Sequence, residues 1–179
     1  IGPSLIMASV RASLRTLTLA QSAADVLLDQ LNRSLRPDLV DGRFITIVIV
    51  VIDPIHHTVE YANAGHAPAL FLRASSGEFT SLVATGVPLG VLDEPRYPRG
   101  LPLHLEVRDM IVLCTDGIVE AMDEKGRQYG RERLERLIAE LVDEPLQTIV
   151  DRIAEDVSSH YASSNPTDDL TVLLARRVR

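Results

Sequence analysis

The spacing of apolar residues changes twice along the chain, and this change constrains the fold more than any other feature. Residues 2–17 and 22–35 carry Leu, Ile and Val at helical spacing. From residue 44 to residue 114 the apolar residues fall instead into short continuous or alternating runs, which are typical of strands. The runs cover residues 44–52, 58–64, 69–73, 78–83, 101–107 and 110–114.

The end of the chain returns to helical spacing and closes with one more apolar run. Residues 131–141 and 145–157 are predicted as helices, and residues 170–175 as a last buried strand. Short turns such as Asp53-Pro54 and Arg108-Asp109 separate successive strands and favour antiparallel pairing. The order therefore predicts an α+β fold of antiparallel sheets flanked by helices, formed by residues 1–179 as a single domain.

Composition narrows the classes of function. The chain has 179 residues with 46% hydrophobic content, which is enough for a substantial core. No apolar run reaches the roughly 18–20 residues that a membrane span needs. The net charge of −7 and the 4% aromatic content argue against a nucleic-acid partner. A single cysteine excludes an internal disulfide framework and fits the reducing cytoplasm.

Several common catalytic patterns are absent from the sequence. It contains no Gly-x-Ser-x-Gly elbow, no Walker A loop and no Gly-x-Gly-x-x-Gly motif. Cys114 is followed by Glu120 at the spacing where a cysteine phosphatase has its arginine, so we interpret Cys114 as a core residue. His56, His57 and His104 show no zinc-binding spacing and are predicted to be structural or solvated.

Carboxylates stand at the ends of two predicted strands. Asp116 follows the run 110–114, and Asp168 and Asp169 precede the run 170–175. If these two strands pair antiparallel, Asp116 and Asp168 meet at one end of the sheet. Converging carboxylates repel unless a cation lies between them, and hard oxygen ligands suit Mg²⁺ or Mn²⁺. A simpler alternative stays open, in which Asp116-Gly117 is an ordinary turn and Asp168 only bends the entry to the last strand.

Four segments together resemble one known family. They are "LCTDGIVEAMDEKGRQYGRERL", "VEYANAGHAPALFLR", "GVPLGVL" and "TDDLTVLLARR", and the similarity runs in consistent order from about Ile1 to Arg179. This combination resembles the stage II sporulation E-like branch of the PPM (type 2C) metal-dependent serine/threonine protein phosphatases. The resemblance implies an α-β-β-α sandwich of two antiparallel sheets, with two divalent ions, Mn²⁺ or Mg²⁺, in the cleft between them.

The resemblance also implies roles for particular residues. Asp116 matches the metal-ligating acid of a Thr/Ser-Asp-Gly motif, and Asp168 matches the first acid of an Asp-Asp/Asn-x-Thr/Ser motif. Asp169 matches a more variable neighbour, and Gly117 matches a backbone position beside the site. No catalytic residue beyond the metal ligands is implied. A further signature, Asn63, Gly65 and His66, carries no family ligand, and we assign it a structural role.

The chain departs from the family pattern at its start. The family places a Gly-Asp-Val-x-Gly-His/Lys-Gly motif just before the helix that begins here at Ile1-Gly2-Pro3, and that motif supplies a bridging aspartate. We therefore expect an N-terminally incomplete domain that lacks its opening strands. On its own it is expected to be inactive or weakly active.

The function expected from the resemblance is hydrolysis of phosphoserine or phosphothreonine in proteins, in bacterial signalling inside the cytoplasm. A small anti-sigma-factor antagonist is the expected kind of substrate, and a sensor domain is expected upstream. The resemblance leaves a homodimer open. The alternative is a non-catalytic, phosphatase-like interaction module, which the retained Asp116 and Asp168 disfavour. A carboxylate-based nuclease is disfavoured by the acidic balance of charge.

Overall fold

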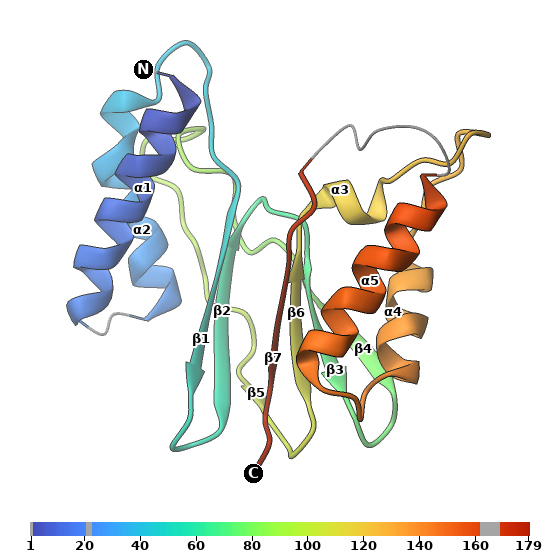
Figure 1. Ribbon diagram of the computed structural model, residues 1–179. Helices are drawn as coiled ribbons and strands as arrows, with labels where there is room; N and C mark the ends of the chain where they lie inside the picture. The colour runs from blue at the N-terminus through green and yellow to red at the C-terminus, as the bar shows by residue number, and fades with distance from the viewer. Residues whose placement is uncertain (1, 21–22, 162–168) are drawn as a thin grey trace. The chain divides into compact units, whose positions relative to one another are not determined.

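The computed structural model shows two compact units, which we describe separately. It describes residues 2–20, 23–161 and 169–179. Unit 1 comprises Ile1–Pro68 and Leu82–His104, and unit 2 comprises Ala69–Ser81 and Leu105–Arg179. Each unit combines one antiparallel sheet with helices, as Figure 1 shows, so the predicted α+β class with two antiparallel sheets is confirmed.

Unit 1 combines two helices with a three-stranded sheet, and α2 packs on both the sheet and α1. Its elements are α1 (Pro3–Leu17), α2 (Ala24–Leu35), β1 (Ile47–Asp53), β2 (Thr58–Ala64) and β5 (Leu103–His104), with short 3₁₀ turns at Thr18–Ala20 and Arg36–Asp38. The strand order is β1-β2-β5. Leu28, Leu31 and Leu35 lie on one face of α2 and are buried against Ala62 and Ala64 of β2. The helical stripe read from the sequence is therefore the face that forms this core.

Unit 2 packs its long helices on a four-stranded sheet. Its elements are β3 (Ala69–Arg73), β4 (Glu78–Leu82), β6 (Met110–Cys114), α3 (Asp116–Val119), α4 (Arg131–Glu140), α5 (Leu146–His160) and β7 (Val172–Arg176). The strand order is β4-β3-β6-β7, which places β6 in the interior of the sheet and β7 at its edge (Figure 1). Helices α4 and α5 bury Leu134, Ile138, Ile149 and Ile153 against it. Burial of such side chains, roughly 1.5–3 kcal/mol each, is the main stabilising contribution.

Strands β1, β5 and β7 differ from the sequence prediction. β7 runs from Val172 to Arg176 rather than over residues 170–175, and as an edge strand it is half-buried to exposed rather than buried as predicted. β1 begins at Ile47 rather than at residue 44, because Ile45 makes only an isolated bridge to Leu89 and Phe44 is exposed. Its residues are half-buried, and Ile52 is exposed, rather than buried as predicted. The run 101–107 contributes only Leu103 and His104, since Pro102 has no N–H to donate and Gly100 bonds instead to the Tyr61 carbonyl. In the part of the chain that the structure describes, no helix is long and apolar enough to span a membrane.

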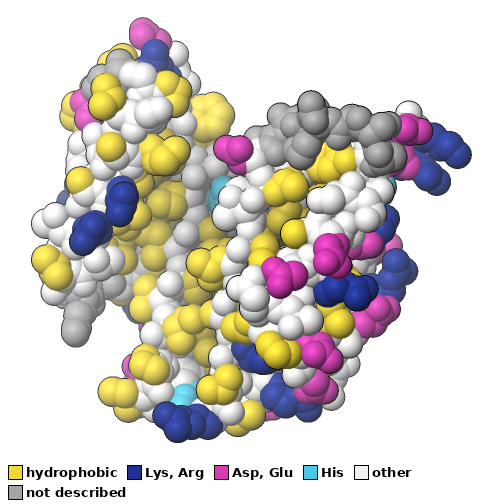
Figure 2. Space-filling model, in the orientation of Figure 1, with side chains coloured by type: hydrophobic (Ala, Val, Ile, Leu, Met, Phe, Trp, Pro, Cys, Tyr) yellow, Lys and Arg dark blue, Asp and Glu magenta, His cyan; other side chains and the backbone are white. Residues whose placement is uncertain are grey.

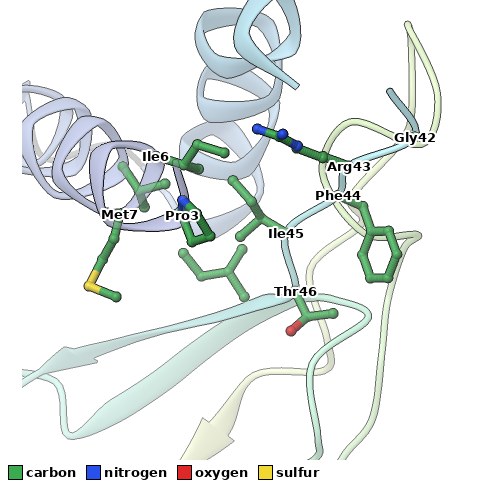
Figure 3. A pocket seen from close by; sticks show the side chains of 10 residues that line it. Pro3, Ile6, Met7, Gly42, Arg43, Phe44, Ile45 and Thr46 are labelled. Atoms are coloured by element: carbon green, nitrogen blue, oxygen red, sulfur yellow. The ribbon is translucent and has the colours of Figure 1, made fainter. Parts of the chain in front are cut away.

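Unit 1 also contains an open apolar cavity of about 670 Å³ between α1 and residues 42–47. Figure 3 shows Pro3, Ile6 and Met7 of α1 on one side of it and Phe44 and Ile45 on the other. None of the described residues that line this cavity is acidic. This apolar lining does not suit a metal ion, in contrast to the carboxylates that the sequence predicts as ligands.

Two buried tyrosines give a matched test of how polar groups contribute to stability. The Tyr129 hydroxyl donates to Asp156 Oδ2 at 2.8 Å, whereas the buried Tyr97 hydroxyl has no hydrogen-bond partner among residues 2–20, 23–161 and 169–179. Burial, and then the charge of Asp29, raises the pKa of Tyr97 to about 12. We expect Tyr129→Phe to lower the free energy of unfolding by roughly 1.5–3 kcal/mol, because it removes a hydrogen bond to a charged group. Tyr97→Phe is expected to be neutral or stabilising, because it removes a hydroxyl that is desolvated without compensation. Urea unfolding of both variants checks this, and equal losses would contradict it.

Candidate metal-binding site

Asp116 lies at the point where β6 passes into α3. Thr115 is extended and precedes the helix as its N-cap, and Asp116 is the first helical residue. The Asp116 side chain is exposed, and its Oδ1 accepts a hydrogen bond from Gly117 N at 3.0 Å. An acid in the first turn interacts favourably with the helix N-terminus. This geometry holds the carboxylate at the surface beyond the end of the strand.

Gly117 is buried and helical, which bears on the first half of the simpler alternative left open by the sequence; the second half concerns Asp168, which lies outside the described residues. The Asp-Gly pair begins α3 rather than forming a tight turn between strands. The Gly117 carbonyl accepts a hydrogen bond from the hydroxyl of Tyr161, at 3.5 Å, and Tyr161 is the C-cap of α5. The backbone directly after Asp116 is thus held by the end of another helix.

The predicted antiparallel pairing of the last strand is confirmed. β6 pairs with β7 from Met110↔Arg176 to Cys114↔Val172. The ladder continues past the strand ends, because Thr115 N donates to Thr171 O at 3.0 Å. The C-terminal end of β6 and the start of β7 therefore meet, with α3 at that end of the sheet (Figure 1).

Thr115 makes two further bonds that the sequence analysis did not foresee. Its hydroxyl donates to Asp169 O at 3.0 Å and accepts from Thr171 N at 3.0 Å. The available signal was a hydroxyl residue directly after an apolar run, a position from which Ser and Thr often bond to backbone groups. That signal does not reveal which distant backbone the hydroxyl contacts.

The structure describes two of the three predicted metal ligands. Asp116 and Asp169 are exposed and belong to segments joined through Thr115. Asp168 lies outside the described residues, so its predicted role as a ligand stays a prediction. Within the described ranges, no group of three or more His, Cys, Asp or Glu side chains could hold a metal ion. The donors that are placed are exposed carboxylates at adjoining strand ends, and they fit Mg²⁺ or Mn²⁺ in chemical type.

Cys114, the last residue of β6, does not have the chemistry of a nucleophile. Burial raises the pKa of its thiol, the negative charge of Asp116 raises it further, and Arg131 opposes the shift. The thiol packs against the core of unit 2. A thiol is a poor nucleophile without its thiolate form, so the interpretation of Cys114 as a core residue agrees with its surroundings.

Asn63, Gly65 and His66 form a tightly bonded turn in unit 1. Asn63 is fully buried; its amide nitrogen donates to Leu82 O and His66 O, and its Oδ1 accepts from His66 N at 2.8 Å. Gly65 has φ +70°, and a Cβ there would lie 2.7 Å from Cγ of Pro88. A larger residue at 65 would be strained on both counts. These contacts agree with the structural role assigned to the signature.

The amino-acid sequence of the chain matches a known protein family. Residues 1–178 match the family described as Stage II sporulation protein E. The phosphoserine phosphatase RsbU of Bacillus subtilis is 29% identical over 177 residues, which cover 99% of this chain and 52% of RsbU. The chain thus spans about half the length of that relative.

Two solved structures share the fold. The PP2C domain of SiaA from Pseudomonas aeruginosa superposes with a TM-score of 0.82 at 19% identity, covering 96% of this chain and 69% of that one. The Mn-presoaked phosphatase domain of the cell fate determinant SpoIIE from Bacillus subtilis gives a TM-score of 0.63 at 18% identity, covering 94% and 73%. Since the sequence match runs through both units and includes the carboxylates at the ends of β6 and β7, the chain belongs to the stage II sporulation protein E (SpoIIE) family.

Proposed function

We propose that this chain is part of a metal-dependent protein phosphatase that removes phosphate from phosphoserine or phosphothreonine in bacterial signalling. The observation that carries the proposal is the join between β6 and β7, which brings the segments of Asp116 and Asp169 together. Membership of the SpoIIE family and the likeness to a named phosphoserine phosphatase support the same reaction.

The proposed metal ligands are Asp116 and Asp168, with Asp169 as the neighbouring acid at the more variable position and Gly117 as the backbone position beside them. The proposed cofactor is a pair of divalent ions, Mn²⁺ or Mg²⁺. When bound, such ions activate a water for attack on phosphorus and neutralise charge on the phosphoryl oxygens. The chain's own contribution is to orient its carboxylates: Gly117 N holds Asp116 Oδ1, and Thr115 holds the backbone of Asp169.

The biological setting is proposed from the family resemblance. We place residues 1–179 in one catalytic domain, because the family match covers residues 1–178. A small anti-sigma-factor antagonist is the proposed substrate, a sensor domain upstream the proposed input, and the cytoplasm the proposed location. Figure 2 shows Lys and Arg side chains interspersed with Asp and Glu on the face in view, a pattern that does not favour the nuclease alternative there.

The proposal is tested by assaying the full-length protein on a phosphoserine protein and on an aryl phosphate. We expect phosphate release that stops with a chelator and returns when Mn²⁺ is added, because water activation depends on the cation. Calorimetry measures Mn²⁺ binding in the same samples. A protein that binds Mn²⁺ and phosphoprotein without any turnover would support the non-catalytic interaction module instead.

A further inference from the structure

The side chain of Thr115 joins two segments that are far apart in the sequence. Its hydroxyl bonds to Asp169 and Thr171, which lie 54 and 56 residues further along the chain. One bond uses the hydroxyl hydrogen and the other an oxygen lone pair, so the donor and one acceptor position of the group are engaged. Because its side chain is β-branched, its χ1 angle is restricted to few rotamers.

The hydroxyl of Thr115 makes a connection outside the backbone pairing of β6 with β7. The backbone bond from Thr115 N to Thr171 O already extends the pairing of β6 with β7. The hydroxyl adds a bond to the Asp169 carbonyl, two residues before Thr171 and outside the strand. This bond fixes the backbone that carries one exposed carboxylate, while the next residue after Thr115 carries the other.

Carboxylates that converge on one metal site repel one another before a cation arrives. Ordering them in advance lowers the free-energy cost of assembling the site when the ion binds. We propose that Thr115 is a positioning residue for the metal site: its hydroxyl holds the Asp116 and Asp169 segments in the arrangement that binds the cation. This inference rests on the proposed function, and it assigns a role to a residue that is not itself a predicted ligand.

The test compares three variants of the full-length protein. Thr115→Val keeps the branched shape without the hydroxyl, and Thr115→Ser keeps the hydroxyl. Thr80→Val is the control, because Thr80 is an exposed residue of β4 in the same sheet. Calorimetry measures Mn²⁺ affinity, and amide hydrogen exchange without metal measures protection of the Thr171 N–H. If Thr115→Val does not fold, Thr115→Ala takes its place in the same comparison.

We expect Thr115→Val to weaken Mn²⁺ binding by about 10–100-fold, the range seen when groups that orient metal ligands are removed. Exchange at Thr171 should be faster in this variant, since the hydroxyl oxygen that accepts its N–H is gone. Thr115→Ser should restore affinity to within about 3-fold of wild type, and Thr80→Val should match wild type.

Two results would overturn the inference, and they are distinguishable. If Thr115→Val exchanges faster at Thr171 but binds Mn²⁺ as wild type does, the hydroxyl is only structural and the proposed function stands. If the wild-type protein binds no Mn²⁺, the proposed function and this inference both fail.

Discussion

Replacing Asp116 with asparagine is expected to reduce metal-dependent phosphatase activity by about 100-fold or more while leaving the fold intact. Asparagine has nearly the same shape, and its amide oxygen can still accept the hydrogen bond from Gly117 N. It lacks the negative charge with which a carboxylate attracts a divalent cation, so an amide oxygen in its place is a weaker ligand. The side chain is exposed at the start of α3, so the change in unfolding free energy should stay within about 0.5 kcal/mol.

The matched control is Glu120→Gln. Glu120 is exposed and is the C-cap residue of α3. The Glu120→Gln substitution therefore removes one negative charge, as Asp116→Asn does, at a position close to Asp116 along the chain. Phosphate release and Mn²⁺ affinity are measured for both variants and for Asp168→Asn. We expect the Glu120 variant to keep wild-type activity. Equal losses in Asp116→Asn and Glu120→Gln would indicate a general effect of surface charge, and unchanged turnover in Asp116→Asn would remove Asp116 from the metal site.

The sequence was sufficient to predict the join that carries the candidate site. Two apolar runs with acids at opposite ends, 110–114 and 170–175, can bring those acids together only when they pair antiparallel, and the structure pairs them so. The helical stripes of α2, α4 and α5 were also readable, because burial of one face imposes a 3.6-residue period on the sequence. Both signals are properties of a local pattern.

The features that were missed depend on contacts between distant residues. The Asp116-Gly117 pair suits a turn and a helix start equally well, and only its surroundings in the folded chain place it in α3. Thr115 reaches partners more than fifty residues away. The run 44–52 has strong β propensity throughout, yet its first residues find no continuous partner strand and remain outside β1.

The second large effect is a loss of stability, expected in unit 2 on replacement of Asp109, which is not one of the predicted metal ligands. Asp109 is fully buried just before β6, where its carboxylate pairs with the Arg73 guanidinium. It also accepts hydrogen bonds from Ala74 N at 2.9 Å and from Glu106 N at 2.7 Å. One carboxylate therefore ties the turn after β3 to the turn that leads into β6. We expect Asp109→Ala to lower the free energy of unfolding by about 3–5 kcal/mol, the cost of breaking a buried charge pair from one side.

The physical reason is that the partners remain after the carboxylate is gone. Arg73 keeps an exposed neighbour, Glu106, at 3.5 Å, and a contact with the Phe71 ring at 4.9 Å, but it loses its buried counter-ion. The N–H groups of Ala74 and Glu106 lose the buried carboxylate that accepts their hydrogen bonds. Arg108, beside Asp109, has φ +77°, a strained conformation that the surrounding bonds must maintain.

Asp143→Ala is the control for this variant, because it also removes an acid paired with an arginine. Asp143 pairs with Arg108 at the surface, where an ion pair contributes only about 0–1 kcal/mol. Urea unfolding should show a clearly larger loss of unfolding free energy for Asp109→Ala than for Asp143→Ala. Similar small losses in both variants would show that Asp109 does not hold the two turns together. Asp109 and Asp116 lie at opposite ends of β6. The folded fraction of Asp109→Ala should therefore retain its Mn²⁺ affinity, since the bonds of Thr115 at the far end of the strand are unchanged.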